Sequence, residues 1–205
     1  TLTKKLFTFN VITDIHIGSS YDANYEKALS IMLQIDPSSK GIFTVGDNTD
    51  HGYESEYKDL MNNTNTKLQG KDIKVYFTLG NHDMHGTDFK HDTQVKLFKD
   101  YTGSKNSYYY DIIDGTYYIH LANEADNSWE SPAVISETQL KWLDNLLKEA
   151  SKTKGPICVF LHQPIYDTVS GSLPGQNWDG VQDDEALLKI LDKYPNALVF
   201  TGHTH

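Results

Sequence analysis

Short apolar runs alternate along the chain with stretches whose apolar residues recur at the spacing of a helix. This alternation is typical of α/β proteins, in which helices cover the faces of a largely parallel sheet. Several of the runs are almost continuously apolar, as strands buried on both faces are. The runs predict strands at residues 6–13, 42–45, 73–79, 108–112, 117–121, 157–161 and 197–201.

Helices are predicted where apolar residues recur three and four positions apart, at residues 25–35, 136–150 and 183–193. The second of these helices begins with Ser136 and Gln139, whose spacing predicts a capping box. Residues 62–69 are polar and rich in Asn and Thr. We expect a helix to end in this segment and a surface loop to follow. Between two tyrosine-rich strands, Asp114-Gly115 predicts a two-residue hairpin turn.

Length and composition limit the class of protein. A chain of 205 residues with 38% hydrophobic positions is long enough for one compact domain with its own core. The sequence contains no internal repeat and no linker that would divide it. No apolar run approaches the roughly 20 residues that cross a bilayer, so we expect a soluble protein without a membrane partner, either cytoplasmic or exported after removal of an upstream leader.

The charge balance is acidic, with 28 Asp and Glu residues, 18 cationic residues and a formal net charge of -10. Proteins that bind nucleic acid through its phosphate backbone, independently of sequence, rely on basic surfaces. We therefore do not expect bulk nucleic-acid binding of this kind here. All 18 cationic residues are lysines. Without arginine, no guanidinium can clamp a phosphate through two parallel hydrogen bonds. An anion site would therefore have to use metal ions, lysines, histidines or backbone amides.

Polar motifs follow five of the predicted strands. Ligands of α/β proteins bind at the carboxyl ends of the strands, which is where these motifs fall. A single histidine at such a position is more often structural, but five motifs that agree favour a metal site. The motifs are Asp14-Ile15-His16, Gly46-Asp47-Asn48-Thr49-Asp50, Gly80-Asn81-His82-Asp83, His162 and Gly202-His203-Thr204-His205.

The candidate metal ligands are imidazoles, carboxylates and one amide, without a thiolate. This mixture suits Mn, Fe or Zn and does not suit a calcium site or a site for soft metals. The set is larger than one tetrahedral ion uses, and it matches two ions about 3.5–4 Å apart that share a bridging carboxylate. The candidates are Asp14, His16, Asp47, Asn81, His162, His203 and His205.

In this order, the motifs D-x-H, G-D-x-x-D, G-N-H-D, a strand-end H and G-H-x-H resemble those of the calcineurin-like metallophosphoesterase superfamily. The resemblance implies a four-layer αββα sandwich of two mixed β-sheets, with two divalent or mixed-valence transition-metal ions at the strand ends. One ion would be held by Asp14, His16, Asp47 and His205. The other would be held by Asp47, Asn81, His162 and His203, so that Asp47 bridges the two.

The resemblance also implies a phosphohydrolase that cleaves phosphomonoesters or phosphodiesters. The nucleophile would be a metal-bridged hydroxide, formed because the ions lower the pKa of water. His82 would protonate the leaving alkoxide, and Asp50 would hydrogen-bond to His82 and orient it. Asp83 has two interpretations, either hydrogen bonds that support its loop or a part in the shape of the outer site.

Two differences between these motifs and those of known branches indicate which branch of the superfamily the sequence resembles. The Ser/Thr protein phosphatases continue the second motif with arginine and glycine, whereas Asp50 is followed here by His51-Gly52. Purple acid phosphatases place a tyrosine ligand at the position of Asp50. The pattern is closest to the mostly microbial phosphatase and phosphodiesterase branch. The expected partner is therefore a small phosphate-ester substrate, with nucleotides and cyclic nucleotides among the candidates.

The last motif coincides with the end of the sequence at His205. Members of the superfamily usually continue beyond G-H-x-H with strands that complete the second sheet. We therefore expect residues 1–205 to form a single metallophosphoesterase domain that is truncated after its last metal-binding motif.

Two residues near the motifs are candidates for contact with the substrate. Trp178 lies in the Gly- and Ser-containing segment 167–180, whose composition suits a mobile lid, and the alternative is a surface loop whose tryptophan packs down. His85 lies close to the third motif, and the alternative for it is a surface histidine.

Two other functions remain open from the sequence. The first is a metal-binding scaffold or interaction module on the same fold, with little or no turnover. The second is a mononuclear zinc peptidase or amidase, which would require a glutamate base beside an open three-ligand site.

Overall fold

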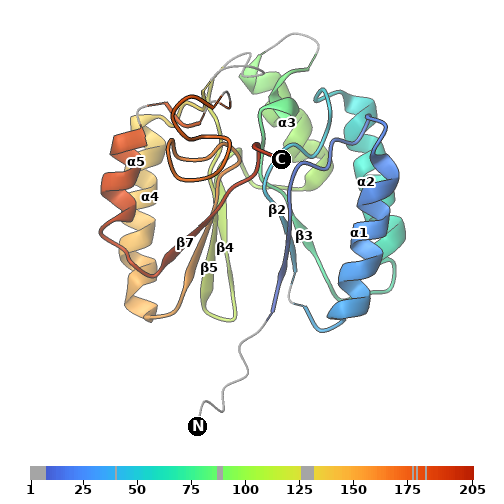
Figure 1. Ribbon diagram of the computed structural model, residues 1–205. Helices are drawn as coiled ribbons and strands as arrows, with labels where there is room; N and C mark the ends of the chain where they lie inside the picture. The colour runs from blue at the N-terminus through green and yellow to red at the C-terminus, as the bar shows by residue number, and fades with distance from the viewer. Residues whose placement is uncertain are drawn as a thin grey trace.

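A computed structural model describes residues 8–39, 41–86, 90–125, 132–176, 178, 180–182 and 184–205 of the chain. Two β-sheets lie face to face, and helices cover the outer face of each (Figure 1). The predicted four-layer αββα sandwich is therefore confirmed. None of the helices in the described part of the chain combines the length and the apolar character that a membrane span requires.

The first sheet is parallel throughout its described strands, whereas the family resemblance implies a mixed sheet here. In order across the sheet these are β1 (Asn10–Ile12), β2 (Ile42–Thr44) and β3 (Val75–Tyr76). The crossover helices α1 (Asp22–Ile35) and α2 (Glu54–Leu68) cover its outer face, and α3 (His91–Thr102) packs against α2 (Figure 1). Parallel crossovers of this kind direct the carboxyl ends of all three strands to one edge.

The second sheet is mixed. In order across the sheet its strands are β4 (Tyr109–Ile113), β5 (Thr116–His120), β6 (Ile157–Phe160) and β7 (Ala197–Phe200). β4 and β5 are antiparallel and join at Asp114 and Gly115, whose φ angles of 49° and 82° form the predicted tight turn. The other neighbours are parallel, and α4 (Glu137–Ala150) and α5 (Asp184–Leu191) cover the outer face (Figure 1).

Aromatic side chains fill the space between the two sheets. Phe43 of β2 stacks on Phe160 of β6 with ring centroids 5.1 Å apart, and on Tyr118 of β5 at 4.4 Å. All three side chains are fully buried. Separate apolar clusters lie between each sheet and its helices. Because large buried rings interlock the sheets, the ends of β2 and β6 are held at a defined distance from each other.

Each of the predicted strands is present. β4 and β5 have the predicted length but are shifted by one residue, and the other strands are shorter than the apolar runs. Residues 6 and 7 of the first predicted strand lie outside the described residues. The loop predicted at residues 62–69 is wrong, because α2 continues to Leu68. Leu60 and Thr64 of this helix are buried, and Thr64 Oγ1 lies 2.8 Å from the Tyr25 hydroxyl of α1. A contact with another helix thus stabilises a polar segment whose local propensity favours a loop.

The capping box predicted at the start of α4 is half correct. The Ser136 hydroxyl accepts a hydrogen bond from the Gln139 amide at 3.1 Å, as predicted. The Gln139 side chain does not return to Ser136, because it bonds to both the amide and the carbonyl of Ala122 at 2.9 Å. This glutamine therefore ties α4 to the segment that follows β5.

Candidate metal centre

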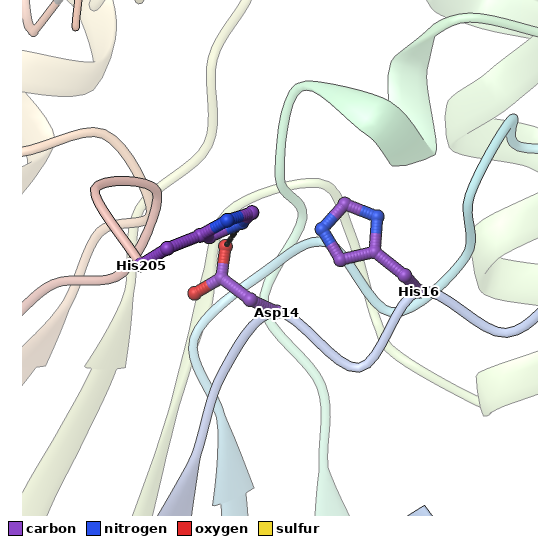
Figure 2. A group of neighbouring side chains, drawn as sticks. All are labelled: Asp14, His16 and His205. Carbon is purple, nitrogen blue, oxygen red and sulfur yellow. Dashed lines mark ion pairs between the residues drawn. The ribbon is translucent and has the colours of Figure 1, made fainter. Parts of the chain in front are cut away.

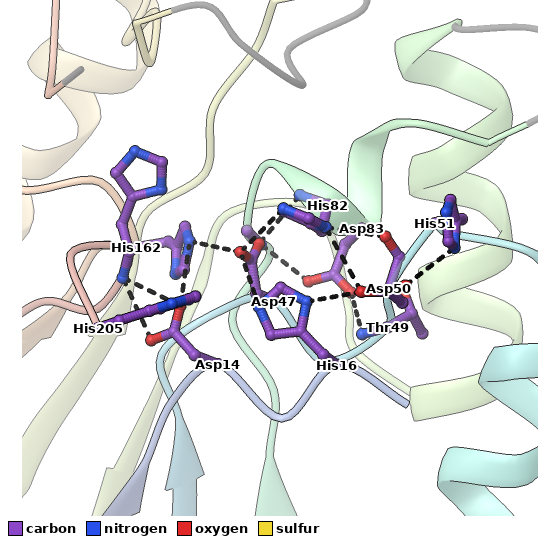
Figure 3. A network of polar contacts seen from close by, with 12 residues as sticks. Asp14, His16, Asp47, Thr49, Asp50, His51, His82, Asp83, His162 and His205 are labelled. Atoms are coloured by element: carbon purple, nitrogen blue, oxygen red, sulfur yellow. Dashed lines mark hydrogen bonds and ion pairs between the residues drawn. The ribbon is translucent and has the colours of Figure 1, made fainter. Parts of the chain in front are cut away.

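The motifs that follow the strands converge at one edge of the sandwich, where both sheets present carboxyl ends (Figure 3). Their imidazole nitrogens and carboxylate oxygens form three groups, and within each group the ligand atoms lie within 4.8 Å of one another. The groups are Asp14 with His16 and His205, His16 with Asp47 and His82, and Asp47 with His162 and His203. Since His16 and Asp47 each belong to two groups, the three groups form one continuous centre.

Most of these residues have a left-handed backbone. The φ angles are 55° at Asp14, 49° at His16, 49° at Asp47, 73° at His203 and 49° at His205. Such conformations cost a residue other than glycine about 1–3 kcal/mol, and they persist where the surrounding structure imposes them, typically at functional sites. The fold therefore holds these side chains in an arrangement that free loops would not maintain.

Two motif glycines allow the segments that carry the ligands to touch. A Cβ atom on Gly46, whose φ is +88°, would lie 2.5 Å from Cγ of His162. A Cβ atom on Gly80 would lie 2.2 Å from the backbone nitrogen of Asp47. Both distances are far shorter than van der Waals contact, so a larger residue at either position would push the ligands apart.

Figure 2 shows the group of Asp14, His16 and His205, in which the His205 side chain is 54% exposed. Nε2 of His205 lies 3.4 Å from Oδ1 of Asp14, whose carboxylate also accepts a hydrogen bond from the His203 amide at 3.2 Å. Nε2 of His16 is buried and has no hydrogen-bond partner in the described part of the chain. Buried polar atoms are almost always paired, so this nitrogen fits a metal ligand.

The group of Asp47, His162 and His203 is more deeply buried. His162 is 1% exposed, and its Nδ1 lies 2.6 Å from the Val45 carbonyl, which fixes the ring so that Nε2 faces Asp47. Burial opposes the charged ring, but the carboxylates of Asp47 and Asp14 raise the pKa of His162 to about 9. Burial, and then the His162 ring, lower the pKa of His203 to about 4. Carboxylates that stabilise a positively charged imidazole in a buried site also stabilise other cations there, and these include metal ions.

Asp47 occupies the middle of the centre. Its Oδ1 accepts a hydrogen bond from the His82 amide at 2.9 Å. Its Oδ2 lies 3.0 Å from Nε2 of His162, 3.7 Å from Nε2 of His16 and 4.0 Å from Nε2 of His82. Burial favours the neutral carboxyl, yet the surrounding imidazoles, His162 most strongly, hold the pKa of Asp47 well below its usual range. Asp47 is therefore an ionised carboxylate that faces both sides of the centre.

His82 starts the short 3₁₀ helix η1 (His82–Met84), directly after the buried Asn81. Its Nδ1 lies 2.8 Å from the backbone carbonyl of Asp50, which leaves Nε2 directed to the centre. The Asp50 carboxylate was expected to orient His82, but Oδ1 lies 3.9 Å from His82 Nδ1 and only 3.0 Å from His16 Nδ1. Asp50 thus contacts His82 through its backbone carbonyl and His16 through its side-chain carboxylate.

Asp83 supports the loops of the centre from beneath. It is fully buried and accepts hydrogen bonds from the amides of Asn48, Thr49 and Gly80 and from the side chains of Asn48 and Thr49. Burial, and then the charge of Asp47, raise the pKa of Asp83. Of its two interpretations, the structure favours support of the loop.

The two candidates for substrate contact lie on different sides of the centre. The Trp178 ring is 41% exposed, and its centroid lies 5.3 Å from that of His203 and 5.4 Å from that of His205. His85 lies near His51, with the two ring centroids 6.0 Å apart. Burial, and then the charges of His51 and His82, lower the pKa of His85. Residues 177 and 179 of the predicted lid lie outside the described residues.

A pocket of about 680 Å³ adjoins the centre and was not anticipated from the sequence. At one end it is lined by Asp14, His16, Asp50 and His205, and at the other by Tyr21, which precedes α1, and by Asn24, Tyr25 and Ala28 of α1. No motif marks the α1 residues, because Tyr25 and Ala28 read as an ordinary apolar helix face in the sequence.

Comparisons with known proteins agree with this geometry. The sequence matches the calcineurin-like phosphoesterase family over residues 7–205. No curated protein matches it significantly.

Among solved structures, a dimetal phosphatase from Danio rerio is similar with a TM-score of 0.67 at 15% identity, over 98% of this chain and 82% of that one. A purple acid phosphatase from yellow lupin (Lupinus luteus) seeds is similar with a TM-score of 0.62 at 12% identity, over 95% of this chain and 37% of that one. At these identities the similarity shows a shared fold.

Proposed function

The chain belongs to the calcineurin-like phosphoesterase family, and from this membership we propose that it hydrolyses small phosphate esters at a centre of two metal ions. Membership makes it a metal-dependent phosphohydrolase in general terms. The observation that carries the finer proposal is the position of Asp47, whose Oδ2 lies within 4.0 Å of ring nitrogens of His16, His82 and His162.

We propose that the Asp47 carboxylate is shared by the two ions, and we divide the other ligands according to the side of Asp47 on which they lie. Asp47 lies at the junction, so one ion would be held on the side of His16 and the other on the side of His162. The full sets are Asp14, His16, Asp47 and His205 for the first, and Asp47, Asn81, His162 and His203 for the second. Oxygen and imidazole ligands of this kind suit Mn, Fe or Zn.

His82 is proposed as the general acid. When bound, the ions make the attacking water more acidic and place positive charge beside the phosphoryl group. This positive charge takes the place of arginine side chains, which the sequence does not contain. The carbonyl of Asp50 accepts the hydrogen of His82 Nδ1, so the exchangeable proton is the one on Nε2. Because Nε2 faces the centre, a protonated His82 can donate this proton to the leaving oxygen.

The proposed substrate is a phosphomonoester or phosphodiester with a sizeable organic group. The half-exposed Trp178 stands beside His203 and His205 and offers an aromatic surface at the rim. A nucleotide or cyclic nucleotide has a planar group that such a surface stacks against. His85 is retained as a second candidate for substrate contact.

The test combines metal analysis with turnover. Metal content per chain is measured by elemental analysis after loading with Mn, and hydrolysis of p-nitrophenyl phosphate is compared with that of its bis-ester. Close to two ions with turnover supports the proposal, and the preferred ester separates monoesterase from diesterase. Two bound ions without turnover on either ester favours the alternative, a metal-binding scaffold or interaction module on this fold. A single bound ion would instead contradict the proposed centre of two metal ions.

A further inference from the structure

Asp50 lies between two imidazoles and contacts both through its carboxylate. Oδ1 lies 3.0 Å from Nδ1 of His16, and Oδ2 lies 3.3 Å from Nδ1 of His51 (Figure 3). Asp50 is partly buried, with 23% of its side chain exposed. Of the proposed metal ligands, His16 is the one whose ring nitrogen lies within hydrogen-bond distance of this carboxylate in the described contacts, so the carboxylate lies on the His16 side of the centre.

The contacts continue beyond His51 to the start of α2. Nδ1 of His51 lies 3.2 Å from Oε1 of Glu56, whose other oxygen accepts hydrogen bonds from the amides of His51 at 2.8 Å and Tyr53 at 3.1 Å. Glu56 is 6% exposed, so helix backbone and packing hold it firmly. The His51 ring is also stacked on Tyr53, with centroids 5.2 Å apart and an interplanar angle of 10°.

This arrangement decides which nitrogen of His16 is available to a metal. A carboxylate can only accept a hydrogen bond, so Asp50 holds the hydrogen of His16 on Nδ1. The lone pair then lies on Nε2, the buried nitrogen without a hydrogen-bond partner that faces Asp47 at 3.7 Å. A carboxylate behind a ligand imidazole both orients the ring and makes it a better donor to the metal.

We propose that Glu56, His51 and Asp50 form a positioning chain that holds the ligand His16 from the N-terminus of α2. The proposal rests on the proposed metal centre. The same residue Asp50 holds His82 through its backbone carbonyl, so a displacement of Asp50 would change the ligand and the general acid together. The effect on the ion at Asp14, His16 and His205 is expected to exceed that on the ion at His162 and His203.

The first test examines Asp50 itself. Binding of Co²⁺ is followed by its visible absorption in the wild type, in Asp50→Ala and in Asp50→Asn, whose amide oxygen can still accept from His16. Loss of such a partner typically weakens metal binding about 10–100-fold, and we expect this loss for one ion in Asp50→Ala. Asp50→Asn should recover most of the affinity. Equal binding of both ions in Asp50→Ala and the wild type would overturn the proposal.

The second test examines the chain beyond Asp50. His51→Phe can keep the stacking on Tyr53 but removes Nδ1, so we expect a weaker loss in the same ion than in Asp50→Ala. His91→Gln is the matched control, because it removes an imidazole at the start of α3, outside the chain of contacts. If His51→Phe and His91→Gln bind Co²⁺ identically, the chain ends at Asp50 and the proposal fails for His51 and Glu56.

A readout without metal separates this proposal from the proposed function. In the metal-free protein, ¹⁵N shifts of the His16 ring should show the hydrogen on Nδ1, and Asp50→Ala should lose this preference. If the wild type binds fewer than two ions but shows the Nδ1–H form, the dimetal function fails and the positioning stands. If Asp50→Ala folds, keeps the Nδ1–H form and binds both ions normally, the positioning fails and the function stands. If Asp50→Ala does not fold, the ring shifts in His51→Phe decide, and an unchanged His16 ring there would refute the chain.

Discussion

Oδ2 of Asp47 lies 3.0 Å from Nε2 of His162, although Asp47 follows β2 of the first sheet and His162 follows β6 of the second. The proposed centre therefore spans the boundary between the sheets. Its geometry depends on the packing of Phe43 against Phe160, which sets how closely the two strand ends approach.

Replacement of Asp47 tests whether one carboxylate serves two ions. Asp47→Ala should reduce the metal content of the loaded protein from about two ions toward none, because each ion loses a charged ligand at the buried junction. Elemental analysis after gel filtration provides the measurement. The exposed Asp72→Asn is the control for loss of a carboxylate. Retention of one tightly bound ion in Asp47→Ala would show that Asp47 does not bridge.

Replacement of His82 tests the general acid. His82→Ala should keep both ions and lose about 10²–10⁴-fold in kcat on alkyl phosphate esters, whose leaving alkoxide needs a proton. The loss should be much smaller on p-nitrophenyl esters, because p-nitrophenolate leaves without protonation. Comparison of kcat on the two classes of ester measures this difference, and an equal loss on both would remove His82 from the role.

Gly80 tests the close approach of the third motif to Asp47. The methyl group of Gly80→Ala would lie 2.2 Å from the Asp47 nitrogen, so the variant should lose about 1–3 kcal/mol in the free energy of unfolding and part of its metal affinity. Urea titration and metal analysis measure the two effects. Gly155→Ala is the matched control, since the nearest atom to its added Cβ is Thr153 Oγ1 at 3.7 Å. Comparable behaviour of the two variants would contradict the steric argument.

The buried His120 should make the protein less stable in acid. Burial, and then the charge of Lys74, lower the pKa of His120 to about 3, whereas the unfolded chain has a pKa near the usual 6.5. Above pH 6.5 neither state binds the proton, and below it only the unfolded state does. Stability should therefore fall by about 1.4 kcal/mol for each pH unit below 6.5, until the pH approaches 3.

The measurement is the free energy of unfolding by urea at pH 7 and pH 5, in the wild type and in His120→Gln. Glutamine does not titrate and can still bond to Thr78, the partner of His120 Nδ1 at 2.7 Å. Between pH 7 and pH 5 the wild type should lose about 2 kcal/mol more than the variant. Parallel losses in the two proteins would show that His120 is not the source.

The sequence was sufficient for the features that depend on neighbouring residues. A continuous apolar run such as that of β6 is already a buried strand, and Asp114-Gly115 is already a tight turn, because both preferences are local. It was not sufficient for the second half of α2, where the burial of Thr64 against Tyr25 outweighs the local preference of an Asn- and Thr-rich segment.

The same division holds in the proposed centre. The sequence by itself determined which residues gather there, since parallel strands bring their carboxyl ends to one edge and each motif follows a strand. Only the tertiary structure decided their partners. The Asp50 carboxylate contacts His16 and His51, and its backbone carbonyl contacts His82. These contacts depend on how separate loops are oriented toward one another. They also depend on the left-handed backbone of Asp47 and His16, which packing imposes. Contacts between segments far apart in the chain leave no spacing in the sequence from which they could be read.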